Sequence, residues 1–459
     1  MLLRFSVENF QSFKSRAELS LVPGKVRRHP SHVIKANGKN DIAALRAAVI
    51  YGANASGKSN LIKAMKHAQM LVNVGVKSGK PLPFRPFKLD EQQLTTPSRF
   101  EFEMKCGQHN YAYGFVTDSQ LIHEEWLYKV DKSKDILVFE RTLVEGKASF
   151  NFEQIKFENN EDAQYLNFTA KGTPENRLFI NECGERNVTK EIDYLTPISE
   201  VIDWFKHQLT IVFPSSKYAG LAMDIKASQQ THAVFAKILQ SFDTGINDLS
   251  LQEVDFDKGL VGIPDSIKQK VVDNLEEVSD VILAGPRNTR YQIAKSSTGD
   301  IQAFKLMTSH IDSQGNEKLF DINEESDGTQ RLLDIAPGLL EIFSGDKTYI
   351  IDELDRSLHP DITTSIFNAF LNLTQQSNAN NSQLIVTTHE TNLLDQQLIR
   401  KDEVWFCQKN KQGESSLYSL EEYQPRFDND IRRGYAVGRF GGVPLLTRFK
   451  DLSWMGADA

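Results

Sequence analysis

The chain has 459 residues, of which 40% are hydrophobic and 25% charged. These proportions are typical of a globular protein and exclude an intrinsically disordered one. The formal net charge of −8 at pH 7 argues against a broadly basic nucleic-acid coat, although it leaves room for local basic patches. This length suits two or three domains, or one large domain with an insertion.

The cysteines and the N-terminus indicate where the protein works. Cys106, Cys183 and Cys407 are scattered and form no CxxC pair and no zinc spacing, which favours reduced thiols in a cytosolic protein. No stretch approaches the roughly 20 apolar residues needed to cross a bilayer. Apolar and polar residues alternate from Leu3 onward, unlike a signal peptide. We therefore expect a cytoplasmic protein without a membrane anchor.

The first part of the chain has mainly strand patterns. Alternating apolar and polar residues predict strands at 2–8 and 17–22. The apolar run 47–51 predicts a strand buried on both faces, and a helical pattern follows from Ser59 to about Val74. Further alternating segments with turn residues between them predict an antiparallel layer: 99–105, 111–117, 121–130 and 136–142.

The second part changes from helical to mixed patterns. Apolar positions at three- and four-residue spacing predict that 190–290 is mostly helical. Strand-like alternation returns at 303–322, around a turn at Gly315. The last third alternates helix and strand, with strands predicted at 349–351 and 384–386, which indicates a parallel sheet with crossover helices.

A phosphate-binding pattern follows the strand at 47–51. Residues 52–59, Gly-Ala-Asn-Ala-Ser-Gly-Lys-Ser, fit GxxxxGK[ST]. Glycines let backbone N–H groups curl around phosphate oxygens, and the following helix directs its positive end at the charge. Lys58 would reach the β- and γ-phosphates, and the Ser59 hydroxyl would coordinate Mg²⁺. A chance match in a Gly-rich turn is the alternative, but the strand before it and the helix after it favour nucleotide binding. The expected nucleotide-binding residues are Gly52, Asn54, Ser56, Gly57, Lys58, Ser59 and Asn60.

A second apolar strand, 348–351, ends in the carboxylates Asp352 and Glu353. In P-loop ATPases an acid at such a strand end holds Mg²⁺, and a neighbouring group positions the attacking water. Consecutive strand residues point to opposite sides, so the two carboxylates can take different roles. Acidic pairs are also common at helix starts. Together with the phosphate loop, the pattern assigns Asp352 to Mg²⁺ and Glu353 to general base catalysis.

Two later segments complete a set of motifs. Ser326-Asp327-Gly328-Thr329-Gln330 precedes a helical pattern, and a strand is followed by His389. Alone, the first is also compatible with a helix-capping turn, and the second with an ordinary core or surface histidine. In their order, the motifs resemble the ABC ATPase superfamily. Residues 326–330 look like its signature motif, 354–360 like its D-loop and His389 like its switch histidine.

The resemblance implies an α/β fold: a P-loop ABC-type ATPase head with mixed antiparallel and parallel sheet lobes. It also implies ATP and Mg²⁺ as ligands and a head-to-head homo-oligomer. In such a pair Ser326, Gly328 and Gln330 of one protomer would close over the nucleotide of the other, and Glu353 and His389 would promote hydrolysis. The signature departs from the commoner Leu-Ser-Gly-Gly-Gln in having Asp327 and Thr329. The glutamine loop is not placed by the sequence, Gln92 and Gln93 being its candidates, and neither is the adenine-stacking residue.

The distance between the motifs implies an insertion. Lys58 and Ser326 are 268 residues apart (326 − 58), a far greater separation than in a transporter ATPase. The excess length implies an insertion into the ATPase head, as in the chromosome-maintenance and Rad50-like branch of the superfamily. The insertion carries several prolines and glycines and no long heptad repeat, so we expect a helical lid without a long coiled coil. The predicted domains are an N-terminal ATPase lobe at 1–189, the helical insertion at 190–300 and a C-terminal ATPase lobe at 301–459.

Segments over nearly the whole chain resemble a narrower family, the prokaryotic AAA15 or RloA-like ATPases found as anti-phage and abortive-infection components. The matching segments are 9–13, 86–89, 112–115, 242–246, 325–331, 402–406 and 435–444. This resemblance implies an ATPase that controls a separate effector, such as a nuclease or toxin, because no second catalytic cluster is visible.

A Rad50- or SMC-like ATPase acting on DNA in repair is the alternative function. It is supported only by short basic clusters such as 25–29 and 432–433, and such clusters also occur on ordinary solvated surfaces. A transporter ATPase is disfavoured by the insertion.

Overall fold

The computed structural model describes residues 1–38, 41–131, 134–144, 146–152, 160–186, 195–218, 221–276, 280–286, 289–296, 299–376, 380–423 and 430–443. The chain forms two compact units. The first unit consists of Met1–Val212, Ile342–Leu354 and Ile366–Ala459, and the second of Phe213–Glu341 and Asp355–Ser365.

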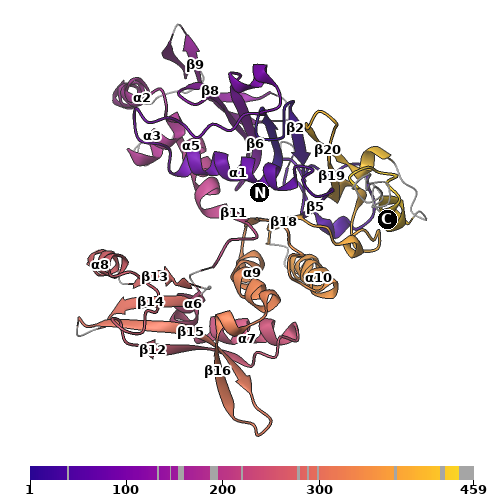
Figure 1. The fold of residues 1–459 in the computed structure, drawn as a ribbon. Coiled ribbons are helices and arrows are strands. Elements are labelled where there is room, and N and C mark those ends of the chain that lie inside the picture. The colour runs from indigo at the N-terminus through magenta and orange to yellow at the C-terminus, as the bar shows by residue number, and fades with distance from the viewer. Residues whose placement is uncertain are drawn as a thin grey trace, which may run out of the picture. The chain divides into compact units, whose positions relative to one another are not determined.

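An antiparallel sheet of seven strands forms one layer of the first unit, in the order β10-β9-β8-β7-β6-β1-β2 (Figure 1). In β6, Phe100 and Phe102 are buried while Glu101 and Glu103 are partly exposed, which is the alternation of a sheet with one face on the core. The strands are β1 (Leu2–Glu8), β2 (Ala17–Ser20), β6 (Ser98–Cys106), β7 (His109–Thr117), β8 (Ile122–Val130), β9 (Ile136–Val144) and β10 (Lys147–Asn151).

The second sheet of this unit has the order β11-β17-β18-β5-β19-β20, and all its strand pairs are parallel except β19 with β20. The residues of β5, β17 and β18 are all buried, as expected for parallel strands covered on both faces. The strands are β5 (Ala47–Tyr51), β11 (Leu209–Val212), β17 (Thr348–Ile351), β18 (Gln383–Thr387), β19 (Val404–Lys409) and β20 (Ser415–Ser419).

Helices accompany both sheets of the first unit. The longest that lies wholly in it, α1 (Lys58–Asn73), buries Leu61, Met65, Ala68 and Val72, the three- and four-residue spacing of an amphipathic helix. The others are α2 (Asn160–Gly172), α3 (Phe179–Glu185), α5 (Thr196–Asp203) with the π-helical turn η4 (Trp204–Gln208), and α11 (Ile431–Ala436). Helix α10 (Pro360–Gln376) begins in the second unit and ends in the first.

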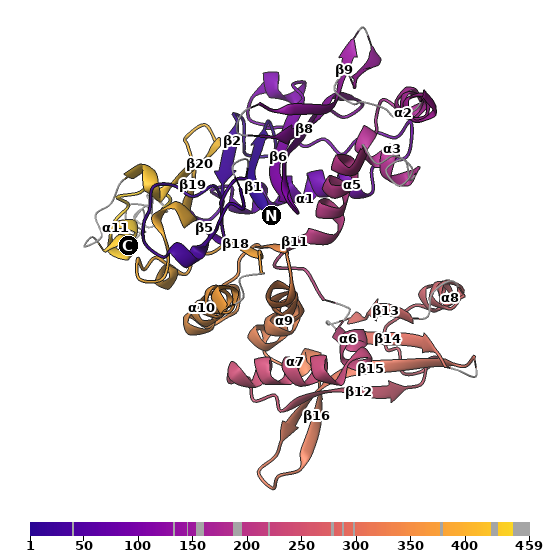
Figure 2. The ribbon, with the colours of Figure 1, turned by 180° about the vertical axis from the view of Figure 1, so that it is seen from behind.

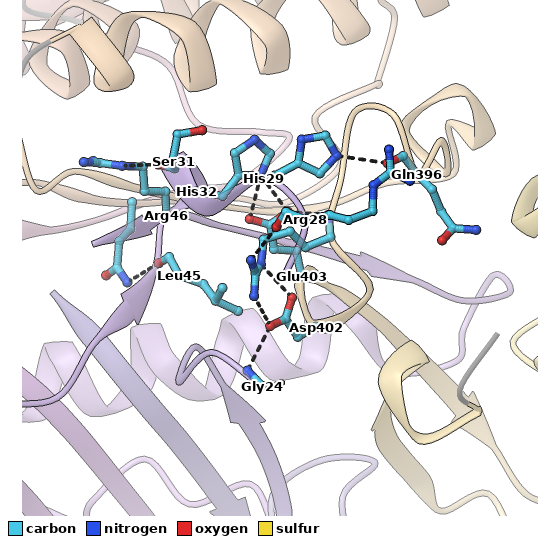
Figure 3. Close-up of polar contacts among 12 residues, drawn as sticks. Gly24, Arg28, His29, Ser31, His32, Leu45, Arg46, Gln396, Asp402 and Glu403 are labelled. Carbon is cyan, nitrogen blue, oxygen red and sulfur yellow. Dashed lines mark hydrogen bonds and ion pairs between the residues drawn. The ribbon is translucent and has the colours of Figure 1, made fainter. Parts of the chain in front are cut away.

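A buried polar network joins two segments that lie far apart in the sequence (Figure 3). The His32 Nδ1 atom lies 3.0 Å from Glu403 Oε1, and the Arg400 guanidinium donates to both oxygens of Asp402 at 2.9 and 2.7 Å. The Gly24 N–H also donates to Asp402. Burial raises the pKa of Glu403, against the lowering effect of His32. Because Glu403 directly precedes β19, the network fixes the start of a strand next to β5.

His67 of α1 lies between aromatic rings of the first unit. Its ring centroid is 5.2 Å from that of Phe10 and 5.3 Å from that of Phe100. Burial, with a smaller contribution from Arg85, lowers the pKa of His67 from 6.5 to about 4. Because the folded-state pKa is depressed, the stabilisation is fully present above the unfolded pKa and is lost as the pH falls towards about 4.

A phenylalanine at this position is expected to remove that pH dependence. Between about pH 8 and pH 5, wild-type protein should lose about 1–2 kcal/mol more unfolding free energy than His67→Phe, because only the histidine takes up a proton on unfolding. Urea denaturation at both pH values measures the difference. Parallel loss of stability in the two proteins would contradict the assignment of a partly buried imidazole with a lowered pKa.

The second unit contains a five-stranded antiparallel sheet in the order β12-β15-β14-β13, with β16 paired to β15. In Figures 1 and 2 the β15–β16 hairpin projects from this sheet. The strands are β12 (Asp248–Val254), β13 (Asp280–Ala284), β14 (Arg290–Lys295), β15 (Ile301–Ile311) and β16 (Glu317–Asp321). The helices are α6 (Leu221–Ala227), α7 (Gln229–Ser241), α8 (Asp265–Asn274) and α9 (Asp327–Ser344), the last of which ends in the first unit.

The mixed α/β class with antiparallel and parallel sheets is confirmed, and the segment 190–290, predicted to be mostly helical, contains helices but also strands that were not predicted. Strands β11, β12 and β13 lie there alongside the helices α5 to α8. Short apolar runs have the same periodicity signal in a strand and in a buried helix, so the pattern alone did not separate them. The compact units divide after Val212 and after Glu341, and the domain boundaries at 189 and 300 stay a prediction.

Two expectations concern long helices. In the described ranges the longest helix, α9, has 18 residues, so this part of the chain contains no long coiled coil. None of the described helices has both the length and the apolar composition needed to cross a bilayer.

Candidate nucleotide-binding site

The phosphate loop connects β5 to α1, as its sequence predicts. Two of its residues have positive φ angles, Ala55 (62°) and Gly57 (119°), and Gly57 is the N-cap of α1. A Cβ atom at Gly57 would lie 2.3 Å from Ser415 Oγ, and one at Gly52 would lie 2.3 Å from the Cys407 carbonyl oxygen. Both glycines are therefore needed for the close approach of the loop to β19 and β20.

The Lys58 ammonium lies inside the loop. Its Nζ atom donates to the carbonyl oxygens of Gly52 at 2.7 Å and Ala53 at 3.2 Å, and the residue is only 6% exposed. Asn54 at the tip of the loop is exposed. A buried positive charge at the first turn of a helix is a favourable environment for a phosphate group.

The opposite side of the loop is anchored to the first unit by hydroxyl and thiol groups. Ser415 Oγ lies 2.6 Å from the Ser56 carbonyl oxygen and 2.8 Å from Ser12 Oγ. The Asn60 amide donates to Ser12 Oγ at 2.8 Å. Burial raises the pKa of the Cys407 thiol to about 11, so the thiol stays protonated and donates to the Ser56 carbonyl. Hydrogen bonds within the protein itself therefore hold the loop in place.

Asp352 lies directly after β17 and faces the start of α1. The Ser59 hydroxyl donates to Asp352 Oδ1 at 3.2 Å, and the Thr387 hydroxyl donates to the same oxygen at 2.6 Å. Asp352 is 2% exposed. The structure therefore brings together the two residues that the sequence assigns to Mg²⁺. A hydroxyl and a carboxylate oxygen are suitable ligands, because Mg²⁺ is commonly held by one or two carboxylates together with phosphate oxygens and water.

Glu353 has an unusual backbone conformation, with φ at 51°. The left-handed region costs a non-glycine residue about 1–2 kcal/mol, and such outliers cluster at functional sites. Its N–H donates to Thr387 Oγ1 at 2.8 Å, and its side chain is partly exposed. The candidate general base is therefore a strained residue that a neighbouring strand holds in place.

His389 follows β18, two residues beyond Thr387, and is exposed. Strands β17, β18 and β5 are parallel neighbours, so the residues that follow them lie at one edge of the sheet. This edge carries the phosphate loop, Asp352, Glu353 and His389. In open α/β sheets, ligands bind at the carboxyl ends of the strands.

The candidate signature motif lies in the second unit, at the start of α9. The Ser326 hydroxyl accepts a hydrogen bond from the Thr329 N–H at 3.1 Å, which is the geometry of a helix N-cap. A Cβ atom at Gly328 would lie 2.6 Å from the Ser357 carbonyl oxygen. The glycine thus permits close contact between the signature motif and the predicted D-loop.

The glutamines proposed for the site have local contacts. The Gln330 amide donates to the Glu325 carbonyl at 2.9 Å. Gln92 and Gln93 lie in the 3₁₀ turn η2 (Glu91–Leu94), and the Gln93 carbonyl accepts from the Asn9 side chain. The assignment of Gln92 or Gln93 to a glutamine loop stays a prediction.

A cavity of about 480 Å³ next to the phosphate loop was not predicted from the sequence. Ser12 and Asn60, which join the loop to the N-terminal turn, line it. Its lining also includes three cationic side chains, Arg85, Lys88 and Lys409. Segments 9–13 and 86–89, which carry part of the resemblance to AAA15 or RloA-like ATPases, border this cavity, and that was the available signal.

Some solved structures are similar to the chain at low sequence identity. No curated protein matches it. Among solved structures, an SMC head bound to the C-terminal winged-helix domain of ScpA is 12% identical, with a TM-score of 0.38, and the match covers 92% of this chain and 99% of that one. The protein cbiO1 from Clostridium perfringens, part of the ABC transporter complex cbiONQ, is also 12% identical, with a TM-score of 0.27, and the match covers 96% of this chain and 98% of that one. Both scores are low, so the fold description rests on the topology of the chain itself.

A family model matches residues 47–395, well over half of the chain. The matched range begins with β5 and includes the phosphate loop, the signature motif, the acidic pair and His389. The chain therefore belongs to the AAA-domain family described as a putative AbiEii toxin of a type IV TA system.

Proposed function

We propose that this protein is an ATPase that binds ATP and Mg²⁺ at the carboxyl edge of the β17-β18-β5 sheet. The observation that carries the proposal is the hydrogen bond from the Ser59 hydroxyl to Asp352 Oδ1. It joins a helix start suited to phosphate with a carboxylate suited to Mg²⁺, across two strands distant in sequence. Ser59 and Asp352 would hold the ion, which would neutralise charge on the β- and γ-phosphates.

The remaining residues of the site have distinct roles in this proposal. Lys58 contacts the phosphates, and Glu353 accepts a proton from the water that attacks the γ-phosphate. His389 contacts the γ-phosphate from the end of β18. The cavity lined by Ser12 and Asn60 receives the adenosine part of the nucleotide, since it adjoins the phosphate loop.

ATP joins two protomers head to head in this proposal. The family resemblance of 326–330 to a signature motif supports a site completed by Ser326, Gly328 and Gln330 of the partner subunit. The N-capped start of α9 offers backbone N–H groups to a phosphate, as helix starts do. Hydrolysis then releases the heads, so that the γ-phosphate controls a two-state interface.

Mixing two inactive variants tests whether the site is shared. Lys58→Ala and Ser326→Arg should each lack ATPase activity. A mixed dimer has one site with both defects and one with neither, so equal mixing should restore about a quarter of the wild-type sites. Phosphate release measures the recovery, and native mass spectrometry measures subunit exchange.

The matched control mixes Lys58→Ala with Glu353→Gln. Both residues belong to the first unit of one chain, so each site of that mixed dimer keeps one defect and no activity should return. If the Lys58→Ala and Ser326→Arg mixture shows no ATPase activity although subunit exchange has been demonstrated, the sites are either not shared or cannot hydrolyse ATP independently. A nucleotide-bound structure with Ser326 remote from every phosphate would exclude the role assigned to Ser326.

We propose further that the ATPase cycle controls a partner effector in an anti-phage defence system. The family description, which names a putative toxin of a type IV TA system, and the resemblance to abortive-infection ATPases support it. DNA processing in the manner of a Rad50-like head is the alternative, motivated by the exposed Arg27 and Arg28 of the first unit. Co-purification from the native operon separates the two: a nuclease or toxin favours the first, and DNA with a repair nuclease the second.

A further inference from the structure

The Thr387 hydroxyl connects the two carboxylate residues of the site. It donates its proton to Asp352 Oδ1 at 2.6 Å and accepts the Glu353 N–H at 2.8 Å. A hydroxyl has one proton to donate and lone pairs that accept, so Thr387 can make both bonds at once. Thr387 is fully buried, so water does not compete for the hydroxyl. One oxygen atom thus sets the position of both the Mg²⁺ carboxylate and the backbone of the general base.

Thr387 also holds the next peptide of the strained turn. Its carbonyl oxygen accepts the Leu354 N–H at 3.0 Å. Two consecutive N–H groups, those of Glu353 and Leu354, are therefore bound to one residue, on either side of the backbone that carries φ at 51°. This two-point attachment fixes the direction in which the Glu353 side chain leaves the main chain.

We propose that Thr387 is a positioning residue that aligns Asp352 and Glu353 with each other through its hydroxyl group. The inference rests on the proposed ATPase function and extends it to a residue that does not itself touch the nucleotide. Threonine is suited to this position, because its branched side chain fits a buried parallel strand while its hydroxyl supplies one donor and one acceptor. An isosteric valine would leave Asp352 Oδ1 without this donor and the Glu353 N–H without its acceptor.

The test compares Thr387→Val with Thr387→Ser. Valine should lower single-turnover ATP hydrolysis by about 10- to 100-fold, the range typical of groups that orient metal ligands, and should raise the Mg²⁺ concentration for half-maximal activity. The dissociation constant of ATP without Mg²⁺ should change less than about twofold, since the phosphate loop is untouched. Serine keeps the hydroxyl and should restore most of the rate and the Mg²⁺ dependence.

Thr169→Val is the matched control, because Thr169 is a fully buried threonine of the first unit whose hydroxyl has no hydrogen-bond partner among the residues that the structure describes. It should leave the rate and the Mg²⁺ dependence unchanged. Equal turnover per folded molecule in Thr387→Val and wild type, with equal Mg²⁺ dependence, would overturn the proposal. If wild-type protein binds MgATP without hydrolysing it, the proposed ATPase activity is wrong, and the role of Thr387 is then tested by the Mg²⁺ dependence of ATP binding. A higher Mg²⁺ requirement in Thr387→Val than in wild type would support the positioning role, and an equal requirement would overturn it.

Discussion

Alanine in place of Lys58 is expected to abolish ATP binding while leaving the fold intact. The ammonium is buried within the loop and is held by two backbone carbonyls. Charge-assisted bonds to phosphate are about twice as strong as neutral ones, and their loss should reduce affinity by about 100-fold or more. The loop keeps its attachments through Ser56 and Ser415, so secondary structure should be retained.

Equilibrium titration with a fluorescent ATP analogue, together with circular dichroism, measures both parts of this expectation. Lys63→Ala is the matched control, because Lys63 is an exposed lysine of the same helix and its removal should not change affinity. A folded Lys58→Ala protein with wild-type affinity would refute the assignment of the phosphate loop.

Glutamine in place of Glu353 should give a protein that binds ATP but hydrolyses it at least about 100-fold more slowly, since a general base contributes about 10²–10⁴ to the rate. The substitution preserves side-chain size and the backbone bond to Thr387. The Ser59–Asp352 pair also stays in place, so MgATP binding should persist. Because the γ-phosphate is not removed, the heads should stay closed.

Phosphate release and light scattering with ATP test this expectation together. Glu161→Gln makes the same charge change at an exposed residue of α2 and should behave as wild type. Normal turnover of Glu353→Gln would show that another group activates the water. If Glu353→Gln hydrolyses ATP slowly but light scattering detects no dimer, then Glu353 acts in hydrolysis, and ATP binding does not hold two heads together.

The sequence was informative where one short segment contains the whole signal. The phosphate loop, its strand and its helix follow from residues 47–74, and the helix begins at Lys58, one residue before the predicted start. Asp352 and Glu353 could likewise be predicted, because an apolar strand directly precedes them. Their spatial relation to the loop came from motif order rather than from any local pattern.

Features made by distant residues were not predictable in this way. Thr387 looks like an ordinary strand residue, and only the packing of β18 beside β17 shows its contacts with Asp352 and Glu353. The cavity beside the loop combines four segments, including Lys409 and Gly413. In the second unit the alternation at 303–322 predicted the β15–β16 hairpin, whereas β12, β13 and β14 were missed, because short apolar runs have the same signal in a strand and in a buried helix.

The position of β5 in its sheet constrains when the protein can fold during its synthesis. Its neighbours are β18 and β19, and Ala47 pairs with Leu384, a separation of 337 residues (384 − 47). Such non-local pairing is slow, because the entropy of closing a long loop is lost before the stabilising contacts between the strands form. While the ribosome is still translating the middle of the chain, the phosphate loop follows a strand that has neither of its partners. A nascent chain therefore carries the complete nucleotide motif long before it can form the site, and ATP binding reports that the last third of the chain has been made and folded.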